Sequence, residues 1–222
     1  MVLDGRVYRL VDGTANVYLV EDGDLTLIDA GVPKDAKEIR EGIRALGHAV
    51  ADVDRVLLTH FDYDHVGALA SLGLNAPIYT GEPDATYVTG AVKPPLTNKK
   101  GLLQRLLSRK LDFPDLTSLP VTDGEEIGGF RAYHTPGHTA GHMVYLHPEF
   151  DIAFLGDCVR EKDSTLQPMS GWLCADSKRN HESITELSAR TPTFDYGAPG
   201  HGDPITAGAS AVLRRVAAGL YT

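Results

Sequence analysis

The chain has 222 residues, a formal net charge of −9 at pH 7 and only two cysteines, Cys158 and Cys174. This length predicts a single domain, residues 1–222, with a sizeable core. The acidic balance argues against general nucleic-acid binding. Because two cysteines do not indicate a disulfide framework, a reducing cytoplasm is the expected compartment. We expect neither a signal peptide nor a membrane span, since no apolar stretch is long enough.

The first part of the chain predicts short strands followed by a helix. The strands are separated by Asp-Gly turns and cover residues 7–11, 16–20 and 25–28. Pro33 opens a helix that ends at Gly47. Its apolar residues share one face: Ala36, Ile39, Ile43 and Leu46. The apolar run at 53–59 predicts the next strand.

The rest of the chain alternates strands and helices around a less regular stretch at 82–120. Strands are expected at 77–80, within 126–134, and at 143–147, 152–155 and 195–198. Helices are expected after residue 65, near 180–189 and from about residue 206.

Potential metal ligands cluster directly after the strand at 53–59, at His60, Asp62, Asp64 and His65. A strand could not present the adjacent Asp64 and His65 on one face, so we expect a loop that opens into a helix, with Gly67 permitting the turn. Three further candidate ligands follow in turns bounded by glycine or proline: His138, Asp157 and His201. Separate loops that each carry such a ligand favour a metal centre built by the fold, although the first segment alone could also be a polar turn with a capping aspartate.

The order of these motifs resembles the metallo-β-lactamase-fold, glyoxalase II-like superfamily of metal-dependent hydrolases. Its signature, His-x-His-x-Asp-His, then a lone His, a bridging Asp and a final His, matches His60, Asp64, His65, His138, Asp157 and His201. Asp62 departs from it, because most members have a histidine there, and the motif becomes His-x-Asp-x-Asp-His. Asp29, in Leu27-Ile-Asp-Ala-Gly31, resembles the aspartate that supports the metal loop from behind. The resemblance implies an α/β fold, the αβ/βα four-layer sandwich, with the metal site at one edge of the sheets.

The resemblance also implies two divalent ions that share Asp157 and a hydroxide. One ion would be held by His60, Asp62 and His138, and the other by Asp64, His65 and His201. Zinc is favoured, and Asp62 shifts the preference somewhat toward iron or manganese because it adds an anionic oxygen. Metal binding lowers the pKa of water to about 7, so a metal-bound hydroxide is the expected nucleophile. Asp64 and Asp157 are the predicted catalytic residues, with Asp64 orienting the water or accepting its proton.

These features predict a hydrolase of an ester, lactone or thioester that acts on a small molecule. Two alternatives stay open: a phosphodiesterase or nuclease of the same fold, and a non-catalytic metal-binding regulatory protein whose site is degraded at Asp62. The sequence contains no Gly-x-Ser-x-Gly motif, which argues against a serine hydrolase. We expect no nucleic-acid or membrane partner, and a homodimer is left open.

The stretch 85–111 lacks acidic residues but carries Lys93, Lys99, Lys100, Arg105, Arg109 and Lys110. Its leucines at 102, 103, 106 and 107 predict a helix with one apolar face. Two interpretations stay open: a solvated helix packed on the body, or a basic cap-like segment at about 82–120 that faces the substrate.

Overall fold

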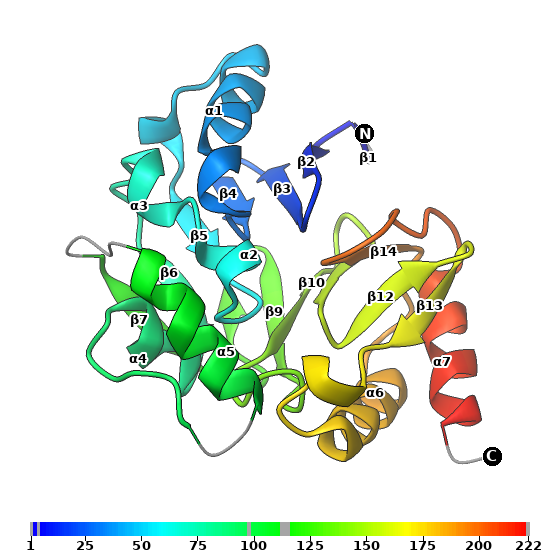
Figure 1. The fold of residues 1–222 in the computed structure, drawn as a ribbon. Coiled ribbons are helices and arrows are strands. Elements are labelled where there is room, and N and C mark those ends of the chain that lie inside the picture. Colours follow the sequence, from blue (N-terminus) through cyan, green and yellow to red (C-terminus); the bar gives the residue numbers. More distant parts are fainter. Residues whose placement is uncertain (1, 4, 97–98, 112–115, 221–222) are drawn as a thin grey trace.

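The computed structural model describes residues 2–3, 5–96, 99–111 and 116–220 (Figure 1). Its larger sheet runs in chain order from β1 to β7. The first strands pair antiparallel, and the strands from β4 onward pair parallel. The strands are β1 (Val2–Leu3), β2 (Val7–Asp12), β3 (Asn16–Glu21), β4 (Leu25–Ile28), β5 (Arg55–Leu57), β6 (Ile78–Gly81) and β7 (Ser118–Val121).

A second sheet has the strand order β14-β11-β10-β9-β8. Its strands are β8 (Glu126–Ile127), β9 (Phe130–His134), β10 (Met143–His147), β11 (Ile152–Gly156) and β14 (Tyr196–Pro199). A separate antiparallel pair, β12 (Val159–Lys162) and β13 (Thr165–Pro168), follows β11.

Helices cover the outer face of each sheet, on opposite sides of the molecule (Figure 1). Ile39 and Ile43 of α1 (Ala36–Ala45) and Leu69 of α3 (Leu69–Leu72) pack on the larger sheet. Leu187 of α6 (Ser177–Arg190) and Leu213 of α7 (Ala209–Gly219) pack on the smaller one. A central core joins the two inner faces and includes Val20, Tyr145 and Phe154. The predicted αβ/βα four-layer sandwich is therefore confirmed.

The strands predicted from the apolar runs are present, and their ends coincide with the prediction or differ by one residue. The run at 53–59 is the exception, because it is in the sheet only over β5. The chain leaves the sheet there because the following residues turn toward the site. The β12–β13 pair was not predicted. The stretch at 82–120, expected to be irregular, contains α4 (Asp84–Val88), α5 (Lys99–Leu107) and β7. The cap-like segment predicted there includes residues 97–98 and 112–115, which lie outside the described residues.

The predicted helix is present as α5, but its leucine face is not the buried one. Leu102 and Leu106 are 56% and 54% exposed, and the buried face carries Lys100, Gly101 and Gln104 instead. Polar side chains are buried here because they have polar partners in the body of the protein, and the leucine spacing could not show those partners.

None of the described helices has the length and apolar character needed to cross a membrane.

The metal-loop motif opens into α2 (Tyr63–Val66), and Gly67 follows it. The backbone of Gly67 is right-handed, with φ −62°, a conformation that any residue can adopt. Glycine is therefore required here because there is no space for a side chain. An added Cβ would lie 2.5 Å from the Tyr63 carbonyl oxygen and 2.6 Å from Pro33 Cδ. Glycine at this position lets the end of α2 pack directly against Val32 and Pro33.

We predict that Gly67→Ala lowers the free energy of unfolding by about 1–3 kcal/mol, because the added methyl group overpacks a contact made with backbone. Urea unfolding measures the change. Gly13→Ala is the matched control, since its added Cβ would lie 3.5 Å from the nearest side-chain atom, an ordinary contact. Equal stability of the two variants would contradict the packing argument.

Candidate metal centre

Asp29 anchors the metal loop from the end of β4. It is buried, and its backbone is left-handed, with φ 57°. Its carboxylate accepts hydrogen bonds from the Thr59 backbone N–H and Thr59 Oγ1, both at 2.8 Å, and from His65 Nδ1 at 2.9 Å. Because the carboxylate accepts the Nδ1 proton, Nε2 is the ring atom of His65 that faces the site, and it can bind a cation in place of its own proton.

A second buried carboxylate, Asp84 of α4, joins two of the ligand-bearing loops. It accepts hydrogen bonds from the Phe61 backbone N–H at 2.8 Å, Thr139 Oγ1 at 2.7 Å and the Gly141 backbone N–H at 3.1 Å. Burial raises the pKa of Asp84. The loop of His60 is thereby tied to the loop of His138. In the sequence, Asp84 is simply an acidic residue in the first turn of a short helix, so no pattern singled it out.

His142 supports Asp157 from behind. Its Nε2 accepts the Asp157 backbone N–H at 2.9 Å, and its Nδ1 lies 2.8 Å from Thr135 Oγ1. Burial holds the pKa of His142 well below its usual range, so the ring is neutral and can accept that hydrogen bond. His142 therefore positions a candidate ligand rather than contributing one.

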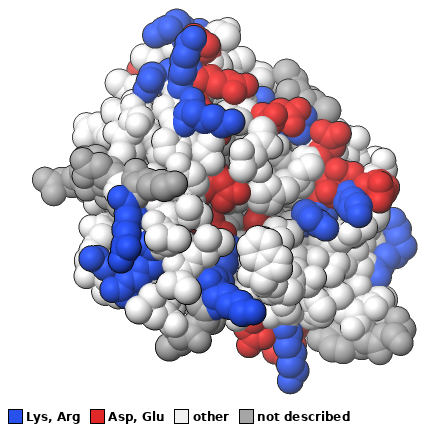
Figure 2. Space-filling model, viewed as in Figure 1, with Lys and Arg blue, Asp and Glu red and all other residues white. Residues whose placement is uncertain are grey.

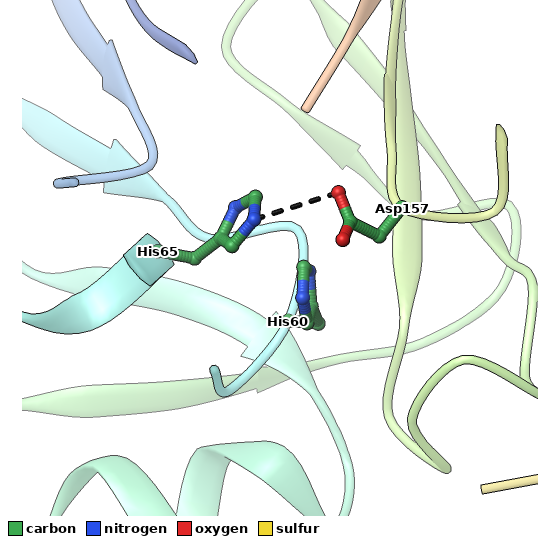
Figure 3. A group of neighbouring side chains, drawn as sticks. All are labelled: His60, His65 and Asp157. Atoms are coloured by element: carbon green, nitrogen blue, oxygen red, sulfur yellow. Dashed lines mark ion pairs between the residues drawn. The ribbon is translucent and has the colours of Figure 1, made fainter. Parts of the chain in front are cut away.

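The structure brings together all the side chains that the sequence predicted as ligands. They form three overlapping groups in which the ligand atoms lie within 4.8 Å of one another: His60, Asp62 and His138; Asp64, His65 and His201; and His60, His65 and Asp157. Figure 3 shows the last group, in which His65 Nε2 lies 3.5 Å from Asp157 Oδ1.

Carboxylates dominate the electrostatics of the site. Burial by itself lowers the pKa of His65, but the Asp29 and Asp157 carboxylates outweigh it and raise this pKa to about 10. Burial by itself raises the pKa of Asp157, yet His65 and His201 hold it well below its usual range. His201 Nε2 lies 3.0 Å from Asp157 Oδ2. The site is therefore built to hold positive charge.

Whether a metal ion fits the site can be judged from the buried polar atoms that form no hydrogen bond. His60 Nε2, His65 Nε2 and Asp157 Oδ1 are buried and have no hydrogen-bond partner among the described residues. Buried polar atoms are rarely left unpaired, and these three face one small volume. Two imidazole nitrogens and a carboxylate oxygen are donors that suit zinc or iron. The residues fit a divalent ion at this point.

The pair Asp62 and His138 is arranged differently, because α5 supplies partners for it. Lys100 Nζ donates to Asp62 Oδ2 and lies 2.9 Å from His138 Nε2. Gln104 Nε2 donates to Asp62 Oδ1 at 2.9 Å. Burial alone would raise the pKa of Asp62, but the Lys100 ammonium, the hydrogen bond of His138 and the nearby His60 imidazole hold it well below its usual range. These atoms already have partners, so this group does not fit an ion as it stands.

A cavity of about 360 Å³ opens onto the site. Its polar wall includes Asp64, Lys100 and Arg160, and its apolar wall consists of Leu103, Leu107, Met169, Trp172 and Leu173. Figure 2 shows acidic side chains at the centre of this face. Arg105 and Arg109 line a different cavity, and Lys99 is exposed. Of the basic residues noted at 93–110, Lys100 is the one that lines the central cavity within the described part of the chain.

The sequence model of the metallo-beta-lactamase superfamily matches residues 10–189. The chain belongs to this superfamily. Relatives include the probable metallo-hydrolase YflN of Bacillus subtilis strain 168, 28% identical over 90% of this chain and 85% of that protein. A hydroxyacylglutathione hydrolase of Pseudomonas aeruginosa is 30% identical over 69% of this chain, and the match spans about half of that protein, 47%. The predicted superfamily and hydrolase class are confirmed at this level, with the substrate unassigned.

Among solved structures, TTHA1623, crystallised in a di-iron-bound form, superposes with a TM-score of 0.68 and 29% identity. The superposition covers 92% of this chain and 96% of that one. The match extends over nearly the whole of both chains, so the two proteins share the sandwich described above.

We predict that Asp29→Asn lowers metal affinity about 10–100-fold, because the variant removes the charge behind His65. Asparagine tolerates the left-handed backbone at this position, so the fold should be kept. A zinc titration against a competing chelator measures the affinity.

Asp22→Asn is the matched control for this prediction. Asp22 also lies beside a buried histidine, His147, at 3.1 Å, but outside the candidate centre. An unchanged affinity in Asp29→Asn, or an equal loss in both variants, would contradict the role assigned to Asp29.

Proposed function

We propose that this protein is a divalent-metal-dependent hydrolase that cleaves an ester, lactone or thioester of a small molecule. The observation that carries the proposal is the concentration of negative charge at the site, where Asp62, Asp64 and Asp157 line one cavity. A phosphodiester would have to bring its own negative charge against these carboxylates, and a neutral carbonyl would not. The similarity to a hydrolase of acylated glutathione supports acyl cleavage.

The proposed metal ligands are the predicted residues that α5 does not engage, namely His60, Asp64, His65, Asp157 and His201. Asp62 and His138 are held by Lys100 and Gln104 instead. Zinc is the favoured ion because imidazole nitrogens predominate, and iron is the alternative because TTHA1623 is di-iron-bound. A bound divalent ion supplies hydroxide at neutral pH and polarises a carbonyl oxygen.

The protein's own groups orient the reactants around that ion. Asp64 is partly exposed to the cavity, and its Oδ2 lies 3.7 Å from His201 Nε2, a position from which it can hold a water or accept its proton. Asp157 is fixed by His142 behind its backbone and by His201 at its carboxylate. The apolar wall that includes Leu103, Met169 and Trp172 suits the carbon skeleton of an acyl substrate.

Arg160 of β12 is a positively charged residue in the cavity wall that takes no part in the hydrogen bonds among the candidate ligands. Its guanidinium has no hydrogen bond or ion pair with the described residues, although the side chain lines the cavity. An unpaired guanidinium on a cavity wall suits a carboxylate or phosphate on the substrate. We therefore propose that the substrate carries an anionic group remote from the bond that is cleaved.

The test of the proposed function compares kcat/KM for a matched aryl ester and aryl phosphodiester on the same metal-loaded sample. We expect the ester to be preferred, since its reacting group brings no charge onto the carboxylates. The same preparation after treatment with a chelator and desalting should lose the ester activity. A higher kcat/KM for the phosphodiester would overturn the acyl-hydrolase proposal in favour of a phosphodiesterase.

We predict that Arg160→Gln raises KM about tenfold for an ester with a carboxylate tail, the equivalent of about 1.4 kcal/mol for a lost charge-assisted hydrogen bond. KM for a neutral ester should not change, and the effect should fade at high salt. Lys162→Gln is the control, because Lys162 is an exposed cation on the same strand. An equal rise in KM for both esters would point to a structural effect instead.

A further inference from the structure

Lys100 lies where the superfamily resemblance would place one of two metal ions. Its side chain comes from α5 and is 5% exposed as a whole residue. Its ammonium donates to Asp62 Oδ2 and lies 2.9 Å from His138 Nε2. His138 Nε2 and His60 Nε2 lie 3.0 and 3.3 Å from the same Asp62 oxygen. The ammonium therefore contacts the same ligand atoms that were predicted to hold an ion.

The position of Lys100 is fixed by its own helix. The neighbouring Gly101 packs so closely against the Pro95 backbone that an added Cβ would collide with the Pro95 carbonyl oxygen. One turn further along, Gln104 donates both to the Phe61 carbonyl oxygen and to Asp62. The contact of Gly101 thus fixes the start of α5, and the hydrogen bonds of Gln104 hold the helix against the metal loop.

The chemistry of residue 62 agrees with a lysine partner. An aspartate supplies the negative charge that a buried ammonium requires, whereas the histidine that most superfamily members have at this position would not. A divalent ion between Asp62 and His138 would be repelled by the ammonium and would have to displace it. Asp62 and Lys100 therefore form a buried ion pair in which each residue supplies the charge that the other requires.

We propose that Lys100 takes the place of one of the two expected metal ions, so that the protein holds a single divalent ion. That ion is left with the donors that Lys100 does not contact. These are His60, His65 and Asp157, whose facing atoms form no hydrogen bond with the described residues, together with the nearby Asp64 and His201. The ammonium supplies the second positive charge of the site. This inference shares with the proposed function only the metal site, and it holds for any substrate.

A consequence follows for residue 62. Restoring the usual histidine alone, in Asp62→His, leaves the ammonium in place and should not create a second metal site. The double variant Asp62→His/Lys100→Met removes the ammonium and supplies a third imidazole beside His60 and His138, so it should bind a second ion.

The experiment counts metal ions per chain in zinc-loaded protein, by elemental analysis after removal of unbound metal. We expect one ion in the wild type and two in Lys100→Met. Lys99→Met is the matched control, because Lys99 is the adjacent lysine of the same helix but is exposed, and it should bind one ion. Cobalt(II) titration followed by visible absorption should saturate at the same numbers of equivalents.

Two ions in the wild type, or one ion in both Lys100→Met and the double variant, would overturn the proposal. If Lys100→Met does not fold, because Asp62 is left buried without its cation, the double variant decides, since it removes both members of the pair. The ion count uses no substrate. A wild type that holds one zinc but cleaves no ester would reject the proposed function and leave this inference intact.

Discussion

The structure depends on a concentration of buried negative charge at one edge of the two sheets. Asp29, Asp62 and Asp157 are all buried within a small region, and such a group of carboxylates stays ionised only if positive charge is held among them. Histidines supply part of that charge, Lys100 supplies part, and the unpaired atoms of His60, His65 and Asp157 mark where a cation belongs. The proposed metal chemistry of the site thus follows from the way the fold brings its carboxylates together.

Gathering the ligands requires anchors that are not ligands themselves. Asp29 holds Thr59 and His65 from the end of β4, and Asp84 ties the His60 loop to the loop of His138. His142 holds the backbone of Asp157 on the second sheet. Each anchor is a buried polar group with its hydrogen bonds satisfied, so the ligands reach the site in fixed orientations. Among these anchors, Asp84 joins the two halves of the sandwich at the site.

Helix α5 links the chemistry of the site to the shape of its cavity. One side of the helix directs Lys100 and Gln104 to Asp62, and Leu103 and Leu107 line the cavity beside them. The same element therefore sets the charge at one end of the site and the apolar wall that a substrate would meet. A superfamily member with a different helix here would differ in both properties together, because both depend on how this helix is seated.

The sequence by itself determined most of the strand and helix order, the superfamily and the candidate ligands, because periodicity and motif spacing are local properties of the chain. It could not show that Lys100 rather than Lys99 or Arg105 enters the site, since that depends on which face of α5 is buried. The leucine spacing left the buried face open, and hydrogen bonds to Asp62 hold the polar face inward. Asp84 and the partners of Asp62 were likewise decided by tertiary structure, since their contacts join residues far apart in the chain.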